Sequence, residues 1–143
     1  AGQADAVMGY DIQVIKAQEQ NLPLVTIGAT FQKDPAALIA HAPAKTLGDF
    51  KTRTLLIGQA SETTFWPWLK RKLGLVEPQT RPYVFDNRAF LADRNAVQQG
   101  FLSSEPYSIE RETGRAPVVL LIADAGFSAY QTTIAISRCS RAR

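Results

Sequence analysis

The sequence predicts an α/β fold with a largely parallel sheet, and two observations carry this prediction. Three segments combine β-branched and aliphatic residues between chain breakers and are predicted strands: LVTIGATF (24–31), TLLIG (54–58) and PVVLLIADAG (117–126). Stretches with helical periodicity alternate with them. Runs this continuously apolar are typical of strands that helices cover on both faces.

Helices are expected over residues 11–20, 64–73 and 88–99, between or beside the predicted strands. In the first segment, Ile12 and Ile15 share one face of a helix. In the third, apolar side chains recur among polar ones at Phe90, Leu91 and Val97. The alternation of these helices with the strands indicates βαβ units.

Two polar segments containing proline or glycine separate the predicted elements, at residues 41–53 and 123–130. They are predicted to be two crossings between lobes. Residues 46–124 would then form one compact βαβαβ lobe. Residues 1–45 and 125–143 would together form part of another.

Composition excludes several classes of function. The chain has 143 residues, a formal net charge of +3, one cysteine (Cys139) and one histidine (His41). Its basic residues are scattered and do not interleave with aromatic ones, so no nucleic-acid partner is expected. A single cysteine and a single histidine cannot build a zinc or iron site, so neither a metal nor a cofactor is expected. His41 is predicted to lie on a surface loop.

Localisation is left open by the residues themselves. No apolar run reaches the length of about twenty residues that a membrane span needs. The N-terminus shows no charged and apolar regions of a secretory signal. These features fit either a cytoplasmic protein or a mature or truncated one.

The junction between residues 58 and 67 places polar groups where a strand passes into a helix. Proline is tolerated only in the first helical turn, so Pro67 predicts an N-cap at Thr63 or Thr64. Ser61, Glu62 and Thr63 would then lie on an exposed loop. Such loops, at the carboxyl ends of strands, form the ligand crevice of open α/β sheets.

Two readings of this junction stay open. The hydroxyl residues could simply cap the helix while Phe65 or Trp66 packs in the core. If the loop instead holds a ligand, the Glu62 carboxylate would repel a small anion, because like charges disfavour each other. A neutral or cationic ligand is therefore favoured.

Six segments, in order, resemble one protein family: GQADAVMGYD, VTIGATFQKDPAALIA, KTLGDFKTRTLLIG, SETTFWPWLKRKLGL, QQGFLSSEPYSIERETG and VVLLIAD. The chain is similar to the substrate-binding proteins of ABC importers, in the group that binds nitrate, sulfonates and thiamine-pyrimidine precursors. The resemblance implies a type II periplasmic-binding-protein fold, with a ligand between two lobes. It also implies that the chain holds one complete lobe and part of a second, truncated at both ends.

The resemblance nominates ligand-binding residues segment by segment. MGYD and ATFQKDP correspond to cleft-facing loops of the first lobe, and ASETT and SSEPY to those of the second; Trp66 is added as a ring for stacking. The candidates are Tyr10, Asp11, Phe31, Gln32, Ser61, Glu62, Thr63, Trp66, Ser104, Glu105 and Tyr107.

Several candidates have a structural alternative. Tyr10 and Tyr107 could be core rings with a hydrated hydroxyl, and Phe31 could also lie in the core. Asp11 could be the N-cap of the first helix. Glu105, which precedes a proline, could start a helix that continues through residue 114.

The resemblance implies a non-catalytic receptor that presents a small molecule to a membrane permease, in the periplasm or outside the cell on a membrane anchor. Carboxylates and aromatic rings among the candidates favour a planar nitrogen heterocycle, such as an aminopyrimidine. One alternative is the ligand-sensing domain of a transcription regulator. Another is an enzyme like the pyrimidine-precursor synthases of related families, whose histidine and cysteine-rich iron site this chain cannot build. An incomplete first lobe would expose strand edges, so a homodimer or an exchange of strands between chains is expected.

Overall fold

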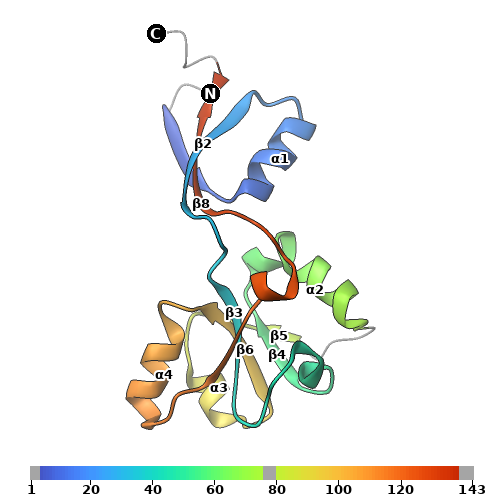
Figure 1. The fold of residues 1–143 in the computed structure, drawn as a ribbon, viewed down its shortest axis with the longest axis vertical. Helices are drawn as coiled ribbons and strands as arrows, with labels where there is room; N and C mark the ends of the chain where they lie inside the picture. Colours follow the sequence, from blue (N-terminus) through green and yellow to red (C-terminus); the bar gives the residue numbers. More distant parts are fainter. Residues whose placement is uncertain (1–3, 76–79, 139–143) are drawn as a thin grey trace. The chain divides into compact units, whose positions relative to one another are not determined.

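The computed structural model describes residues 4–75 and 80–138 of the chain (Figure 1). Cys139 lies outside the described residues. The chain divides into two compact units. Unit 1 comprises the residues up to Asp34 and from Ser128 onward, and unit 2 comprises Pro35–Phe127. The sequence prediction put the two lobe boundaries, within the crossings 41–53 and 123–130, at 45/46 and 124/125. The first lies earlier because residues 36–40 form a strand of the unit 2 sheet.

Unit 1 is a three-stranded sheet with one helix. Its strands are β1 (Ala6–Gly9), β2 (Leu24–Phe31) and β8 (Gln131–Ser137), and β8 lies between the other two, antiparallel to both. Helix α1 (Asp11–Glu19) connects β1 to β2. The strand at 24–31 and the helix starting at residue 11 are thus confirmed. β8 was not predicted, because its alternating polar residues lack a continuous apolar run.

Unit 2 is built on a five-stranded sheet in the order β5-β4-β6-β3-β7. The strands are β3 (Ala36–Ala40), β4 (Thr54–Ile57), β5 (Thr80–Pro82), β6 (Ala96–Phe101) and β7 (Val118–Leu121). β4 is parallel to both β5 and β6, whereas β3 is antiparallel to both β6 and β7. Four strands therefore share one direction, and the prediction of a largely parallel sheet holds for this unit.

Helices cover both faces of the unit 2 sheet, as its apolar strands predict. On one face α2 (Trp66–Leu73) packs Trp66 and Leu69 against Leu38 and Leu55. On the other, α3 (Arg88–Ala92) and α4 (Glu105–Thr113) add one buried side chain each, Phe90 and Ile109. Full burial of one such aliphatic or aromatic side chain contributes about 1.5–3 kcal/mol.

The predicted helix at 88–99 is wrong in its second half. α3 ends at Ala92, and Ala96–Phe101 form β6, at the centre of the sheet. The strand predicted at 117–126 is also shorter, because a 3₁₀ turn at Ala123–Ala125 follows β7 and Gly126 takes a φ of 102°. The helix expected from Glu105 is confirmed as α4, which ends before Gly114 at a φ of 69°.

Short 3₁₀ helices complete unit 2, at Leu47–Phe50 and Gln59–Thr63. In the described parts of the chain, every helix is too short or too polar to cross a membrane.

Candidate functional site

The candidates of unit 2 gather at one end of its sheet. β4 leads into the 3₁₀ helix that carries Ser61, Glu62 and Thr63, and β6 leads into α4 with Ser104 and Glu105. Because β4 and β6 are parallel neighbours, their carboxyl ends lie at the same edge of the sheet. Open α/β sheets bind ligands at this edge.

The junction after β4 differs from its sequence prediction. Residues 59–63 form a 3₁₀ helix rather than an exposed loop, and the Ser61 side chain is buried. The N-cap of α2 is Phe65, not Thr63 or Thr64, and Pro67 is the second helical residue. Only Glu62 and Thr63 stay exposed among the three nominated residues.

Phe65 and Trp66 are buried in the core, so the structural alternative for this junction is confirmed for these two rings. The 3₁₀ helix uses two of the backbone donors that an open loop would have offered. Ser61 N–H donates to Gly58 O at 2.9 Å, and Thr64 N–H donates to Ser61 O at 3.1 Å.

A buried glutamine fixes the end of β4. Gly58 N–H donates to Gln99 Oε1 at 2.8 Å, a buried bond between residues 41 positions apart in the chain. A Cβ atom at Gly58 would lie 3.3 Å from Gln99 Nε2, so glycine allows the amide to approach. Gln99 therefore ties the β4 and β6 ends together at the candidate site.

Glu105 is held by two hydrogen bonds at the start of α4. Tyr83 donates its hydroxyl proton to Glu105 Oε1 at 3.1 Å, and Phe101 N–H donates to Glu105 Oε2 at 2.8 Å. Burial of the Tyr83 ring, and then the adjacent Glu105 carboxylate, raise the pKa of Tyr83 above its ordinary value. A carboxylate has about four lone-pair sites, so these bonds leave Glu105 able to accept more.

A polar chain connects α3, α4 and β6 beside Glu105. Gln98 Nε2 donates to Asn87 Oδ1 at 2.8 Å, and Asn87 Nδ2 donates to Ser108 Oγ at 2.9 Å. Ser108 Oγ donates in turn to Glu105 O at 2.9 Å. Gln98 is fully buried, and its Oε1 atom has no hydrogen-bond partner among the described residues.

Sequence reasoning missed Tyr83, Gln98 and Gln99, which organise this edge. The signal that could have found the two glutamines is the dipeptide itself, because paired amides between Val97 and Gly100 interrupt an apolar run. Tyr83 carries no such signal, since it follows a three-residue strand and meets Glu105 only in the folded chain.

A pocket of about 400 Å³ lies beside this edge, at the ends of β4 and β5. Glu62 and Arg81 both line it, together with Gln59 and Trp66. The pocket therefore presents both signs of charge next to an indole ring. A molecule in this pocket would meet a carboxylate and a guanidinium group.

The remaining α4 candidates are exposed. Tyr107 exposes 68% of its surface, so the alternative of a core ring is wrong for this residue. Ser104, the N-cap of α4, is also exposed.

The candidates of unit 1 lie after β1 and at the end of β2. The N-cap of α1 is Tyr10, not Asp11, and Asp11 is the first helical residue. Asp11 Oδ2 accepts the backbone N–H of Tyr130 at 2.9 Å, so this carboxylate joins α1 to the segment before β8. Phe31 and Gln32 are exposed, which excludes a core position for Phe31.

His41 lies in the loop that directly follows β3, as the sequence predicts, but not fully on the surface. It is half-buried, and its ring stacks on Phe90 with centroids 4.0 Å apart. In the described parts of the chain, no group of three or more His, Cys, Asp or Glu side chains is arranged to hold a metal ion.

Two α/β units connected by two chain crossings, with polar groups at the carboxyl edge of the larger sheet, define a protein with the type II periplasmic-binding-protein fold. The same fold is found in the crystal structure of the periplasmic aliphatic sulphonate binding protein SsuA from Escherichia coli, with a TM-score of 0.64 and 19% sequence identity. The match covers 96% of this chain and 46% of that one, so the chain spans less than half of that structure. The predicted fold class is thereby confirmed.

The chain belongs to the NMT1/THI5-like family, whose profile matches residues 1–142. This match confirms the resemblance that the six sequence segments indicated. Comparison with curated protein sequences gives no match.

Proposed function

We propose that the chain is the solute-binding part of an ABC importer and captures a small molecule for a membrane permease. The observation that carries the proposal is the carboxyl edge of the unit 2 sheet. There, in a chain of this family, Glu105, Tyr83 and Gln99 are fixed by hydrogen bonds while Glu62 stays exposed. Rigid polar groups beside a pocket are typical of ligand sites.

The proposed ligand is a planar nitrogen heterocycle, such as an aminopyrimidine. Glu62 and Glu105 supply acceptors for ring N–H and amino groups, and their charges disfavour nitrate or a sulfonate. Tyr107 supplies an exposed ring that a planar ligand can stack on. The periplasm, or the outer face of a membrane, is the compartment in which such a receptor works.

The receptor role is proposed as non-catalytic and without a cofactor. The ligand-sensing domain of a transcription regulator and a pyrimidine-precursor synthase are the alternative functions. Self-association, which the sequence predicts, stays a prediction that light scattering can test.

A thermal-shift screen tests the proposed ligand class. The chain is heated with aminopyrimidines, aromatic acids, sulfonates or nitrate, each over a range of concentrations. A ligand present at about one hundred times its Kd raises the free energy of unfolding by about 2.7 kcal/mol. We expect an aminopyrimidine to raise Tm and the two anion classes to leave it unchanged.

The matched variants are Glu62→Gln and Glu110→Gln, which each remove one exposed carboxylate from unit 2. Glu62→Gln should weaken aminopyrimidine binding, whereas Glu110→Gln, on α4, should not. Stabilisation by sulfonate or nitrate alone would overturn the heterocycle. If none of these compounds raises Tm, the receptor role of this chain is contradicted.

A further inference from the structure

A second pocket lies at the end of the unit 2 sheet away from the carboxyl edge. The register pairs Ala40, the last residue of β3, with Val97 and Val118 near the starts of β6 and β7. Residues just beyond these strand ends therefore come together. His41 follows β3, Arg94 precedes β6, and Arg115 precedes β7; all three line a pocket of about 650 Å³.

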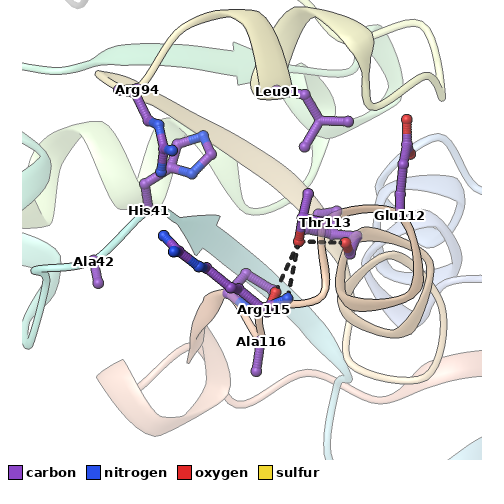
Figure 2. A pocket seen from close by; sticks show the side chains of 10 residues that line it. His41, Ala42, Leu91, Arg94, Glu112, Thr113, Arg115 and Ala116 are labelled. Atoms are coloured by element: carbon purple, nitrogen blue, oxygen red, sulfur yellow. Dashed lines mark hydrogen bonds between the residues drawn. The ribbon is translucent and has the colours of Figure 1, made fainter.

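The polar lining of this pocket is mainly basic. The guanidinium groups of Arg94 and Arg115 form no ion pair or hydrogen bond with the described residues. Glu112 is the one carboxylate in the lining, and Figure 2 shows it across the pocket from His41 and Arg94, with the Arg115 side chain extending toward their side. Two cationic side chains thus lack a counter-ion among the residues that the structure describes.

The His41 wall of the pocket is fixed in place. Its ring lies parallel to the Phe90 ring within 7°, and Nε2 is 2.8 Å from Phe90 O. Because a carbonyl oxygen only accepts, Nε2 carries the proton of this hydrogen bond. Arg53 holds the backbone on either side of Ala42, donating to His41 O at 3.3 Å and to Pro43 O at 2.8 Å.

The opposite wall is ordered by the turn after α4. Arg115 N–H donates to Thr113 Oγ at 3.2 Å, and Thr113 Oγ is 2.8 Å from Ile109 O (Figure 2). These bonds fix the backbone from which the Arg115 side chain projects. Apolar side chains, those of Leu91, Ile109 and Pro117, also line the pocket.

We propose that this pocket binds a small organic oxyanion, a carboxylate or a phosphate monoester carried on an apolar body. A guanidinium group matches the two oxygens of either head group with a pair of parallel hydrogen bonds. The volume lies within the range of pockets that bind small organic ligands, and the apolar lining suits the body of such a molecule. The site is separate from the carboxyl edge, so it does not depend on the proposed solute.

Amide chemical shifts of the ¹⁵N-labelled chain test the proposal residue by residue. The probes are benzoate and phenyl phosphate, with benzyl alcohol as the neutral control, at constant ionic strength. We expect saturable shifts at residues 41, 94 and 113–116 with the anions, with a Kd of about 1 mM or tighter, and none with the alcohol. The relative Kd of the two anions identifies which head group the site prefers.

The double variant Arg94→Gln/Arg115→Gln removes both guanidinium groups while keeping polar, exposed side chains. It should weaken binding of the preferred anion about tenfold or more, because charge-assisted hydrogen bonds are lost. Arg71→Gln/Lys72→Gln is the matched control: it removes the same charge from exposed positions on α2. This control should leave the Kd unchanged.

Three results would overturn the proposal. The first is an absence of saturable shifts at the pocket residues with either anion. The second is an equal loss of affinity in the α2 control, which would assign the effect to net charge. The third is an equal response to benzyl alcohol, which would show that the guanidinium groups are not used.

Discussion

At the residue scale, the Tyr83–Glu105 pair makes the stability of the protein depend on alkaline pH. Burial and the Glu105 carboxylate raise the pKa of Tyr83 above its unfolded value of 10.0. The folded chain therefore keeps the phenol proton at a pH where the unfolded chain has lost it. The stabilising contribution is fully present below the unfolded pKa and decreases as pH rises above it.

We expect the free energy of unfolding to fall between about pH 9 and about pH 11, and Tyr83→Phe to reduce that fall. Urea unfolding at the two pH values measures it. Tyr107→Phe is the matched control, because it removes one phenol hydroxyl from an exposed position on α4. An equal fall in wild type and Tyr83→Phe would contradict the assignment.

Gly100 is a second residue on which the carboxyl edge depends. A Cβ atom there would lie 2.6 Å from Ile39 Cδ1 and 3.0 Å from Glu105 Oε2. Gly100→Ala should therefore destabilise the chain by about 1–3 kcal/mol, since added volume in a packed core forces neighbours to shift. The measurement is urea unfolding at neutral pH.

Gly28→Ala is the control for this substitution. Gly28 also lies in a strand, but no atom would lie within 4 Å of its added Cβ. The change in the free energy of unfolding should then stay within about 0.5 kcal/mol. Equal effects of the two substitutions would show that the close approach at Gly100 does not limit packing.

At the scale of elements, the sequence predicts those helices and strands whose local pattern of apolar residues is clear. The strands at 24–31 and 54–57 and the helix α1 are found where apolar runs or a shared helical face place them. β6 is different. Its two glutamines make Ala96–Phe101 resemble a polar continuation of α3. In the folded chain both glutamines are buried, because Asn87 and Gly58 supply hydrogen-bond partners for their amide groups.

For the candidate site too, some features could be predicted from the sequence and others depend on tertiary contacts. Glu105 and the residues after β4 could be nominated from the resemblance and from their places at strand ends. That Glu105 is bonded to Tyr83, or that Phe65 caps α2, depends on packing between distant segments. Local sequence patterns do not show contacts between distant segments, so they could not predict which nominated residues would be buried.

At the scale of the whole molecule, burial is divided unequally between the two units. The largest fully buried side chains, among them Phe50, Phe90 and Leu38, all lie in unit 2, with the exception of Thr133. In unit 1, α1 buries no residue, and Met8 and Ile134 are exposed on paired strands. Since apolar burial is the main favourable term in folding, unit 1 should open at a lower free energy than unit 2.

Native-state hydrogen exchange of the chain at increasing denaturant tests this order. The amides of β3 and β6, at the centre of the unit 2 sheet, should be protected with the highest free energies, and those of β8 with lower ones. Leu38→Ala should reduce protection in β3 and β6 by about 2–5 kcal/mol, because it leaves a cavity in a packed core. Thr26→Ala, on β2, is the comparison in unit 1. If β8 exchanges only at the free energy of β6, the units unfold as one body, and the difference in burial does not set the order of opening.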